Sequence, residues 1–162
     1  MSDPGGESII EDMPHAELSA EARRNLYNKL ARTTTLGGIY LTDVSVKINP
    51  SALGRKRDDL TRSVNSDADV ITFDKEKGVF AVKINWKIRI KFGRKVVGKI
   101  DAGYMLVYRD ARDFPKEIVE IFVNAVAKGA CYAYFRSLVS TLDWSAGVGS
   151  APLPVIKIDP KV

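Results

Sequence analysis

The stretch Phe80-Ala-Val-Lys-Ile-Asn-Trp-Lys-Ile-Arg-Ile-Lys-Phe92 alternates without a break between apolar side chains and mostly polar ones. The intervening positions carry four cations, Lys83, Lys87, Arg89 and Lys91. A period of two is typical of a β-strand, because successive side chains point to opposite faces of a sheet. The stretch therefore predicts a long strand with one apolar face and one cationic face.

Neighbouring segments extend this strand into an antiparallel sheet. Gly93-Arg94 predicts a turn, and the alternation resumes over 96–108, which indicates a long hairpin. Residues 35–49 predict a half-buried strand whose buried parity contains Tyr40, Val44, Val46 and Ile48. Residues 51–67 are expected to form an exposed connection, and a short strand is expected at 70–73.

Two helices are predicted on either side of the sheet segments in the sequence. Apolar residues recur every four positions over 15–32, which is typical of a short amphipathic helix. A second helix is expected from about residue 114 to 142, with a possible break at Gly129 and an apolar surface too wide for one sheet face to cover. We therefore predict a homo-oligomer with this helix at the interface. The predicted interface residues are Ile118, Ile121, Phe122 and Ala125.

Length and composition place the chain among ordinary soluble proteins. Its 162 residues and 45% hydrophobic content predict one folded domain over 34–162, preceded by the helix at 15–33 and by a disordered tail at 1–14. No apolar run is long enough for a membrane span, and the N-terminus lacks a signal-peptide pattern, so a cytoplasmic protein without membrane contact is expected.

The sequence offers little to an enzyme. The one histidine, His15, lies in a polar N-terminal stretch, and the one cysteine, Cys131, lies among apolar helix residues, where a buried structural thiol is expected. No carboxylate pair has acid–base spacing. We therefore expect no enzyme activity, no metal site and no cofactor.

The cationic face of the predicted long strand leaves two binding hypotheses open. The net charge of +5 permits an acidic partner, including nucleic acid. RNA-binding sheets also present aromatic side chains for base stacking, whereas Phe80, Trp86 and Phe92 belong to the opposite face. A solvated face or an acidic protein partner is therefore favoured over a basic-sheet nucleic-acid-binding protein, which stays as the alternative function.

The order of three motifs resembles the bacterial protein-export chaperone SecB and its SecB-like relatives. Ile39-Tyr-Leu-Thr-Asp-Val-Ser45 is similar to the family's first strand, and Cys131-Tyr-Ala-Tyr-Phe-Arg136 is similar to its helix start, although Ala133 stands where the family usually has proline. Pro152-Leu-Pro-Val-Ile-Lys-Ile-Asp-Pro160 resembles its C-terminal tail. The resemblance covers about residues 35–162 and leaves the N-terminal helix outside.

The resemblance implies an α+β fold: a four-stranded antiparallel sheet with a long C-terminal helix on one side, here with an extra N-terminal helix. It also implies a homotetramer built as a dimer of dimers, which holds unfolded clients in apolar grooves without ATP. The clients would belong to protein export or to a toxin–antitoxin system. Carried over by position, the client-binding groove consists of Ile71, Phe73, Leu153, Val155, Ile156 and Ile158.

The sequence departs from the family on the sheet face that docks the export motor SecA. The family presents acidic residues there, and Asp43 keeps one of them, but Lys47 and Lys99 stand at two others. Two charge reversals would oppose a complementary complex. We therefore expect a delivery partner other than SecA.

Overall fold

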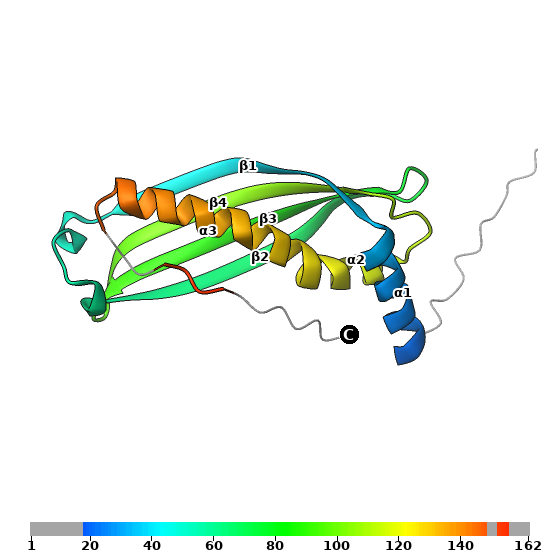
Figure 1. Cartoon of the computed structure of the whole chain (residues 1–162), viewed down its shortest axis with the longest axis horizontal. Helices are drawn as coiled ribbons and strands as arrows, with labels where there is room; N and C mark the ends of the chain where they lie inside the picture. The colour runs from blue at the N-terminus through cyan, green and yellow to red at the C-terminus, as the bar shows by residue number, and fades with distance from the viewer. Residues whose placement is uncertain (1–17, 149–151, 156–162) are drawn as a thin grey trace, which may run out of the picture.

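The computed structural model describes residues 18–148 and 152–155, which form one sheet and one layer of helices (Figure 1). The strands are β1 Thr35–Ile48, β2 Leu60–Asp74, β3 Val79–Phe92 and β4 Lys95–Arg109. The helices are α1 Ala20–Thr33, α2 Lys116–Phe122 and α3 Lys128–Ser145, with a π-helical turn at Val123–Ala127 between the last two. The predicted α+β architecture is confirmed.

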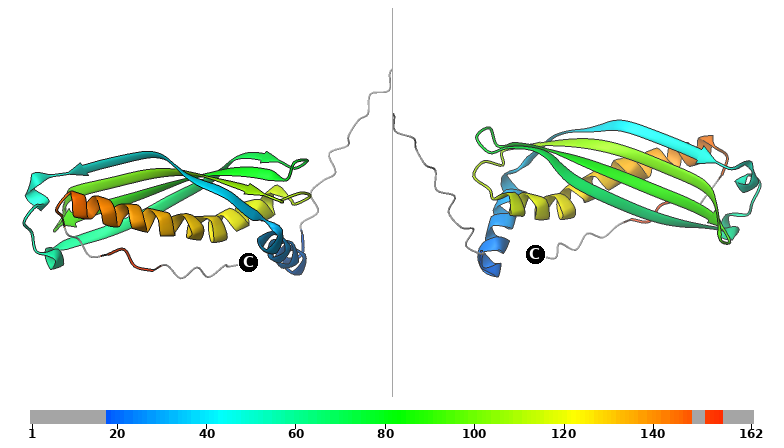
Figure 2. Two further views of the ribbon diagram at one scale, coloured as in Figure 1. Left: turned by 45° about the horizontal axis from the view of Figure 1, so that its top comes forward. Right: turned by 180° about the vertical axis from the view of Figure 1, so that it is seen from behind.

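The four strands are antiparallel and lie in the order β1-β4-β3-β2, so the β3–β4 hairpin forms the centre of the sheet. Gly93 adopts a positive φ of 56° in the hairpin turn, a conformation that glycine takes without strain. The helices lie on one side of the sheet, which we call the helix face (Figure 2). The other side, the open face, is covered by no segment that the structure describes.

The core lies between the central hairpin and the helices. Alternate residues of β3 from Phe80 to Ile90 are buried on the helix face, as the period of two predicted. Trp86 stacks on Phe135 of α3, with ring centroids 5.2 Å apart. Near the start of β3, Phe80 stacks on Tyr108 at 5.0 Å, and Phe122 of α2 meets both rings edge-on. Aromatic packing therefore holds both α2 and α3 on the sheet.

The prediction of a short strand at 70–73 was wrong, because β2 begins at Leu60 and is as long as its neighbours. Its helix-face positions include Arg62 and Ser66, which pair with Ile90 and Trp86 of β3. These polar residues interrupt the apolar alternation, so the strand had no clear period in the sequence. The predicted exposed connection shrinks to residues 49–59, which contain two short 3-10 turns, Pro50–Ala52 and Arg57–Asp59.

The predicted burial of β1 was also wrong. A register shift between Leu41 and Asp43 places Tyr40 opposite Met105 on the open face, whereas Val44 pairs with Ala102 on the helix face. Every residue of the strand is exposed or half-buried, because β1 is an edge strand and the helical segments pack over β2, β3 and β4.

The helical segments agree closely with the sequence prediction. α1 begins after Ser19, whose hydroxyl accepts a hydrogen bond from the Ala22 amide, and it packs against α2 through an ion pair of 3.0 Å between Arg23 and Glu117. α3 continues through Gly129, so the possible break predicted there does not occur. The stretch Lys116–Ser145 is long and apolar enough to cross a membrane, but part of it is buried on the sheet, as in the core helix of a soluble protein.

Buried ionisable groups in the core predict a loss of stability in alkaline solution. Burial raises the pKa of Tyr108 from 10.0 to about 12 and the pKa of Cys131 from 9.0 to about 11. The unfolded chain ionises at lower pH than the folded chain. The stability that these two groups contribute in their protonated form is therefore complete below pH 9 and is lost as the pH approaches 12. Urea-unfolding midpoints are expected to fall over this range.

The variant Y108F isolates one of these groups. The Tyr108 hydroxyl is buried and has no hydrogen-bond partner within the described part of the chain, so its removal is expected to stabilise the protein by about 1 kcal/mol at neutral pH. The alkaline loss should become shallower as well. Y40F, which changes a tyrosine that is 52% exposed, is the matched control and should alter neither quantity. A destabilised Y108F would contradict this account of the hydroxyl.

Candidate functional site

A groove runs across the end of the sheet where β2 meets α2. It consists of two adjoining hollows of about 830 and 710 Å³, which share Lys75 and Lys116. Ile71 and Phe73, two of the predicted client-binding residues, line the second hollow. Ile71 is the extra residue of a β-bulge between Val70 and Thr72, and its side chain is 51% exposed. The bulge therefore leaves an apolar side chain in solvent beside the groove.

The described part of the C-terminal tail, Pro152–Val155, lies beside β2 and α3 on the helix face (Figure 1). The Arg62 guanidinium donates a hydrogen bond of 3.1 Å to the Pro152 carbonyl, and the Tyr132 hydroxyl donates one of 2.7 Å to the Pro154 carbonyl. These contacts bury Leu153, whereas Val155 is 72% exposed. The tail is thus anchored by its backbone and presents one apolar side chain.

The predicted groove residues therefore fall into two groups on the same edge of the sheet. Arg62, which holds the tail, and Ile71 are nine positions apart on β2, or about 30 Å at the rise of a β-strand. Ile71 and Phe73 lie at one end, and Leu153 and Val155 lie toward the other. Ile156 and Ile158 lie outside the described residues.

A second apolar surface follows β1 on the helix face. We call it the β1 strip; its members are Leu36, Ile39, Leu41, Val44, Val46 and Ile48. Leu41, Val44 and Val46 are 47%, 46% and 38% exposed. The outer edge of β1 pairs with no described strand, so exposed apolar side chains and free backbone groups occur together there. The sequence had placed Val44, Val46 and Ile48 on one apolar face, but it had added Tyr40, which lies on the open face, and it had not indicated that the strip would stay uncovered.

The residues predicted for an oligomer interface are divided by the fold. Ile118 and Phe122 are buried against the sheet of their own chain, and Ile121 and Ala125 are half-buried. Only the last two retain surface that another chain could contact.

The open face carries the charged residues predicted for partner docking. Asp43 accepts a hydrogen bond of 3.1 Å from the Thr42 hydroxyl and lies over Gly103, where a larger residue would collide with its carboxylate. Lys47 and Lys99 are directly opposite each other in the β1–β4 register, and both are exposed.

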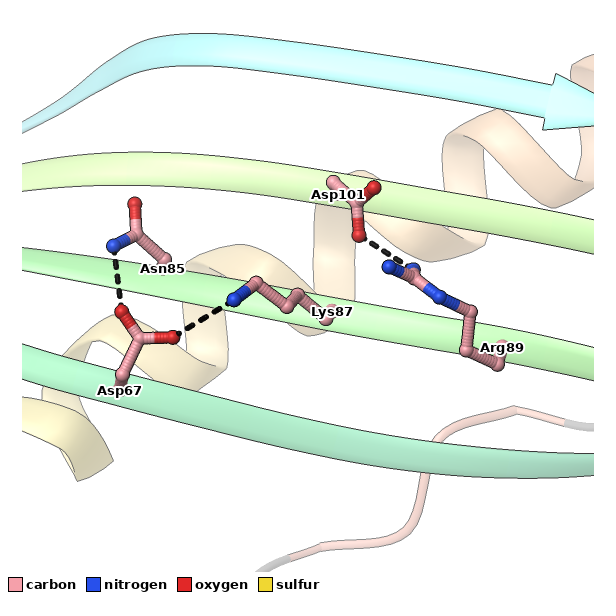
Figure 3. A network of polar contacts seen from close by, with 5 residues as sticks. All are labelled: Asp67, Asn85, Lys87, Arg89 and Asp101. Atoms are coloured by element: carbon pink, nitrogen blue, oxygen red, sulfur yellow. Dashed lines mark hydrogen bonds and ion pairs between the residues drawn. The ribbon is translucent and has the colours of Figure 1, made fainter.

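Two acidic residues of the open face are engaged with neighbouring side chains (Figure 3). Asp67 accepts hydrogen bonds from Asn85 at 2.7 Å and from Lys87 at 3.2 Å, and Asp101 pairs with Arg89. The hydrogen bond from Asn85, together with Lys87, lowers the pKa of Asp67. Both acids therefore neutralise cations of β3.

The interior shows no reactive centre within the described ranges. The Cys131 sulfur is buried and accepts a hydrogen bond of 3.3 Å from the Trp86 indole, and burial raises the pKa of the thiol to about 11, so it stays protonated at neutral pH. No three side chains of the types that bind metals come together in residues 18–148 and 152–155.

Comparison with known proteins identifies the fold. No family model and no curated protein sequence matches this chain. The structure is similar to that of the SecB-like chaperone Rv1957 of Mycobacterium tuberculosis, solved in complex with a ChAD peptide from the antitoxin HigA1 (Rv1956). The TM-score is 0.73 at 16% identity, and the match covers 83% of this chain and 99% of that chain.

A protein of unknown function from Streptococcus agalactiae also aligns, with a TM-score of 0.39 and 9% identity over 77% of this chain and 97% of that chain. The first of these matches establishes that the chain has the SecB-like fold, as the sequence motifs had suggested.

Proposed function

We propose that this protein, whose fold is SecB-like, is an ATP-independent chaperone of the cytoplasm. It holds unfolded or aggregation-prone polypeptides in the groove between β2 and α2 and along the anchored tail. Its clients belong to protein export or to a toxin–antitoxin system, and a client of the latter kind is suggested by the antitoxin peptide bound to the M. tuberculosis protein. It has no catalytic role.

The observation that carries this proposal is the exposure of Ile71 at the rim of a large, open hollow on the edge of the sheet. Unfolded chains offer apolar side chains together with unpaired backbone amides. An edge strand beside a hollow that is lined by apolar and charged side chains can bind both, since the strand supplies hydrogen-bonding groups and Ile71 and Phe73 offer apolar contacts. Half-buried Phe73 and exposed Val155 add apolar contacts along the same edge.

The β1 strip fits a different role. It is an apolar row along the opposite edge of the sheet from the groove, and we assign it to contact with a second copy of the chain. The homotetramer implied by the family resemblance would require this contact and one more. Such an arrangement leaves the β2 edge of each chain free for a client.

The variant I71D tests the client groove. A carboxylate at this position removes the exposed apolar side chain and is costly to desolvate under a client, so suppression of aggregation of a refolding protein is expected to weaken several-fold. N65D is the matched control, because Asn65 is also exposed on β2 and gains the same charge without removing an apolar side chain. Light scattering at low and high salt measures the suppression of aggregation by both variants, and suppression by the native protein should change little with salt. Equal activity of I71D and the native protein would place the client elsewhere.

A further inference from the structure

The open face carries an unusual row of like charges near the β3–β4 turn. Lys47 of β1 lies opposite Lys99 of β4, and Lys99 lies opposite Arg89 of β3, so three cations stand side by side across three strands. Lys91 follows two residues after Arg89 on the same face and is exposed. We call Lys47, Lys99 and Lys91 the lysine row.

The acids of the open face do not neutralise this row. Asp101 is paired with Arg89, and Asp67 is engaged by Asn85 and Lys87 (Figure 3). Within the described residues, no ion pair involves Lys47, Lys91 or Lys99. Like charges that face each other across strands destabilise a sheet, so the row costs the isolated chain stability and a bound anion would relieve the repulsion.

We propose that the lysine row binds an acidic polypeptide segment in an extended conformation. The members of the row lie on three neighbouring strands, which are about 4.8 Å apart, and alternate side chains of an extended chain are about 6.6–6.8 Å apart, so carboxylates at alternate positions of a segment that crosses the strands come within reach of the long lysine side chains. Val96, which pairs with Lys91 on this face, is 42% exposed and offers an apolar contact between the charges. A segment that combines carboxylates with apolar residues therefore complements the row.

The face favours a short acidic peptide over nucleic acid. Asp43 and Asp69 share the open face, beyond the row, and would repel a phosphate backbone that continued along the sheet. The exposed aromatic residue Tyr40 lies far from the row on β1, so no stacking platform accompanies the cations. The unpaired cations are lysines, which act as point charges and lack the bidentate geometry with which arginine recognises phosphate.

The inference extends the proposed function by giving the chaperone a second, acidic partner at a face other than the client groove. A fluorescent peptide of alternating glutamate and leucine is titrated with the full-length protein, and its anisotropy is measured at low salt. The same peptide with glutamine in place of glutamate, a single-stranded DNA and a peptide from the SecA C-terminal tail serve as comparisons. The glutamate peptide is expected to bind more tightly than each of the three comparisons, and its advantage over the glutamine peptide should fall as salt is added.

The variant K47E/K99E is expected to bind the glutamate peptide about tenfold more weakly or worse. K47Q/K99Q removes the same two charges without reversing them, so it is expected to show a smaller loss of affinity and to fold even if K47E/K99E does not. K83E/R24E changes the net charge equally at exposed sites outside the row and should bind like the native protein. Binding of DNA in preference to the peptide, tight binding of the SecA peptide, or no binding at all would overturn the inference. K47E/K99E is expected to suppress aggregation as well as the native protein does. The experiment therefore distinguishes a loss of chaperone activity from a loss of binding to the acidic partner.

Discussion

The variant V44E/V46E is expected to elute as a single chain in size-exclusion chromatography with light scattering, whereas the native protein elutes as an oligomer. Both valines belong to the β1 strip and are more than a third exposed in the single chain. Burial of each valine in an interface contributes about 1.5 kcal/mol or more. A two-fold interface repeats every substitution, so four carboxylates would meet in one apolar contact.

S45E/K47E is the matched control for this experiment. Ser45 and Lys47 alternate with the two valines on the same strand but lie on the open face. The control is expected to remain an oligomer. A monomeric native protein would refute the oligomer itself, and an oligomeric V44E/V46E would move the interface away from the β1 strip.

The variant F135A is expected to lower the free energy of unfolding by about 3–5 kcal/mol. Phe135 is fully buried, stacks on Trp86 and lies 6.5 Å from the Tyr132 ring, so its removal leaves a cavity at the contact between α3 and the sheet. Urea unfolding at one fixed protein concentration measures the loss, since oligomerisation would otherwise change the apparent stability.

Y134A provides the comparison at the neighbouring position of α3. Tyr134 is 56% exposed, and its truncation is expected to cost less than about 1 kcal/mol. A loss below 1 kcal/mol in F135A would mean that α3 is not held to the sheet by this aromatic contact.

The central hairpin could be predicted because its two strands have one buried and one solvated face, so burial appears directly as a period of two. β2 could not be predicted in this way, since the polar residues Arg62 and Ser66 lie on its helix face, where Arg62 donates a hydrogen bond to the C-terminal tail. The exposure of β1 could not be predicted from the sequence either. Its apolar pattern is that of a covered strand, and only the position of the helices shows that it is bare.

The candidate sites were predictable to a similar degree. Ile71 and Phe73 could be named from a family resemblance, but the bulge that exposes Ile71 depends on the register between β2 and β3. The cationic side chains of β3 were evident from their spacing. Their alignment with Lys47 and Lys99 required the pairing of three strands, which no local pattern encodes.

The π-helical turn at Val123–Ala127 corrects the angular phase of the helix layer. Buried residues recur at every fourth position through the turn: Val119, Val123, Ala127, Cys131, Phe135 and Val139. In an uninterrupted α-helix, with about 100° per residue, the last of these would be rotated by about 200° from the first and would point away from the sheet. A π-bulge accommodates one extra residue and takes back about 100° of that rotation, and the coiling of the sheet accommodates the remainder. The turn therefore acts as an angular offset that keeps α2 and α3 aimed at the same surface, and straightening it into regular α-helix with all of its residues kept would turn Phe135 by about 100° away from the sheet.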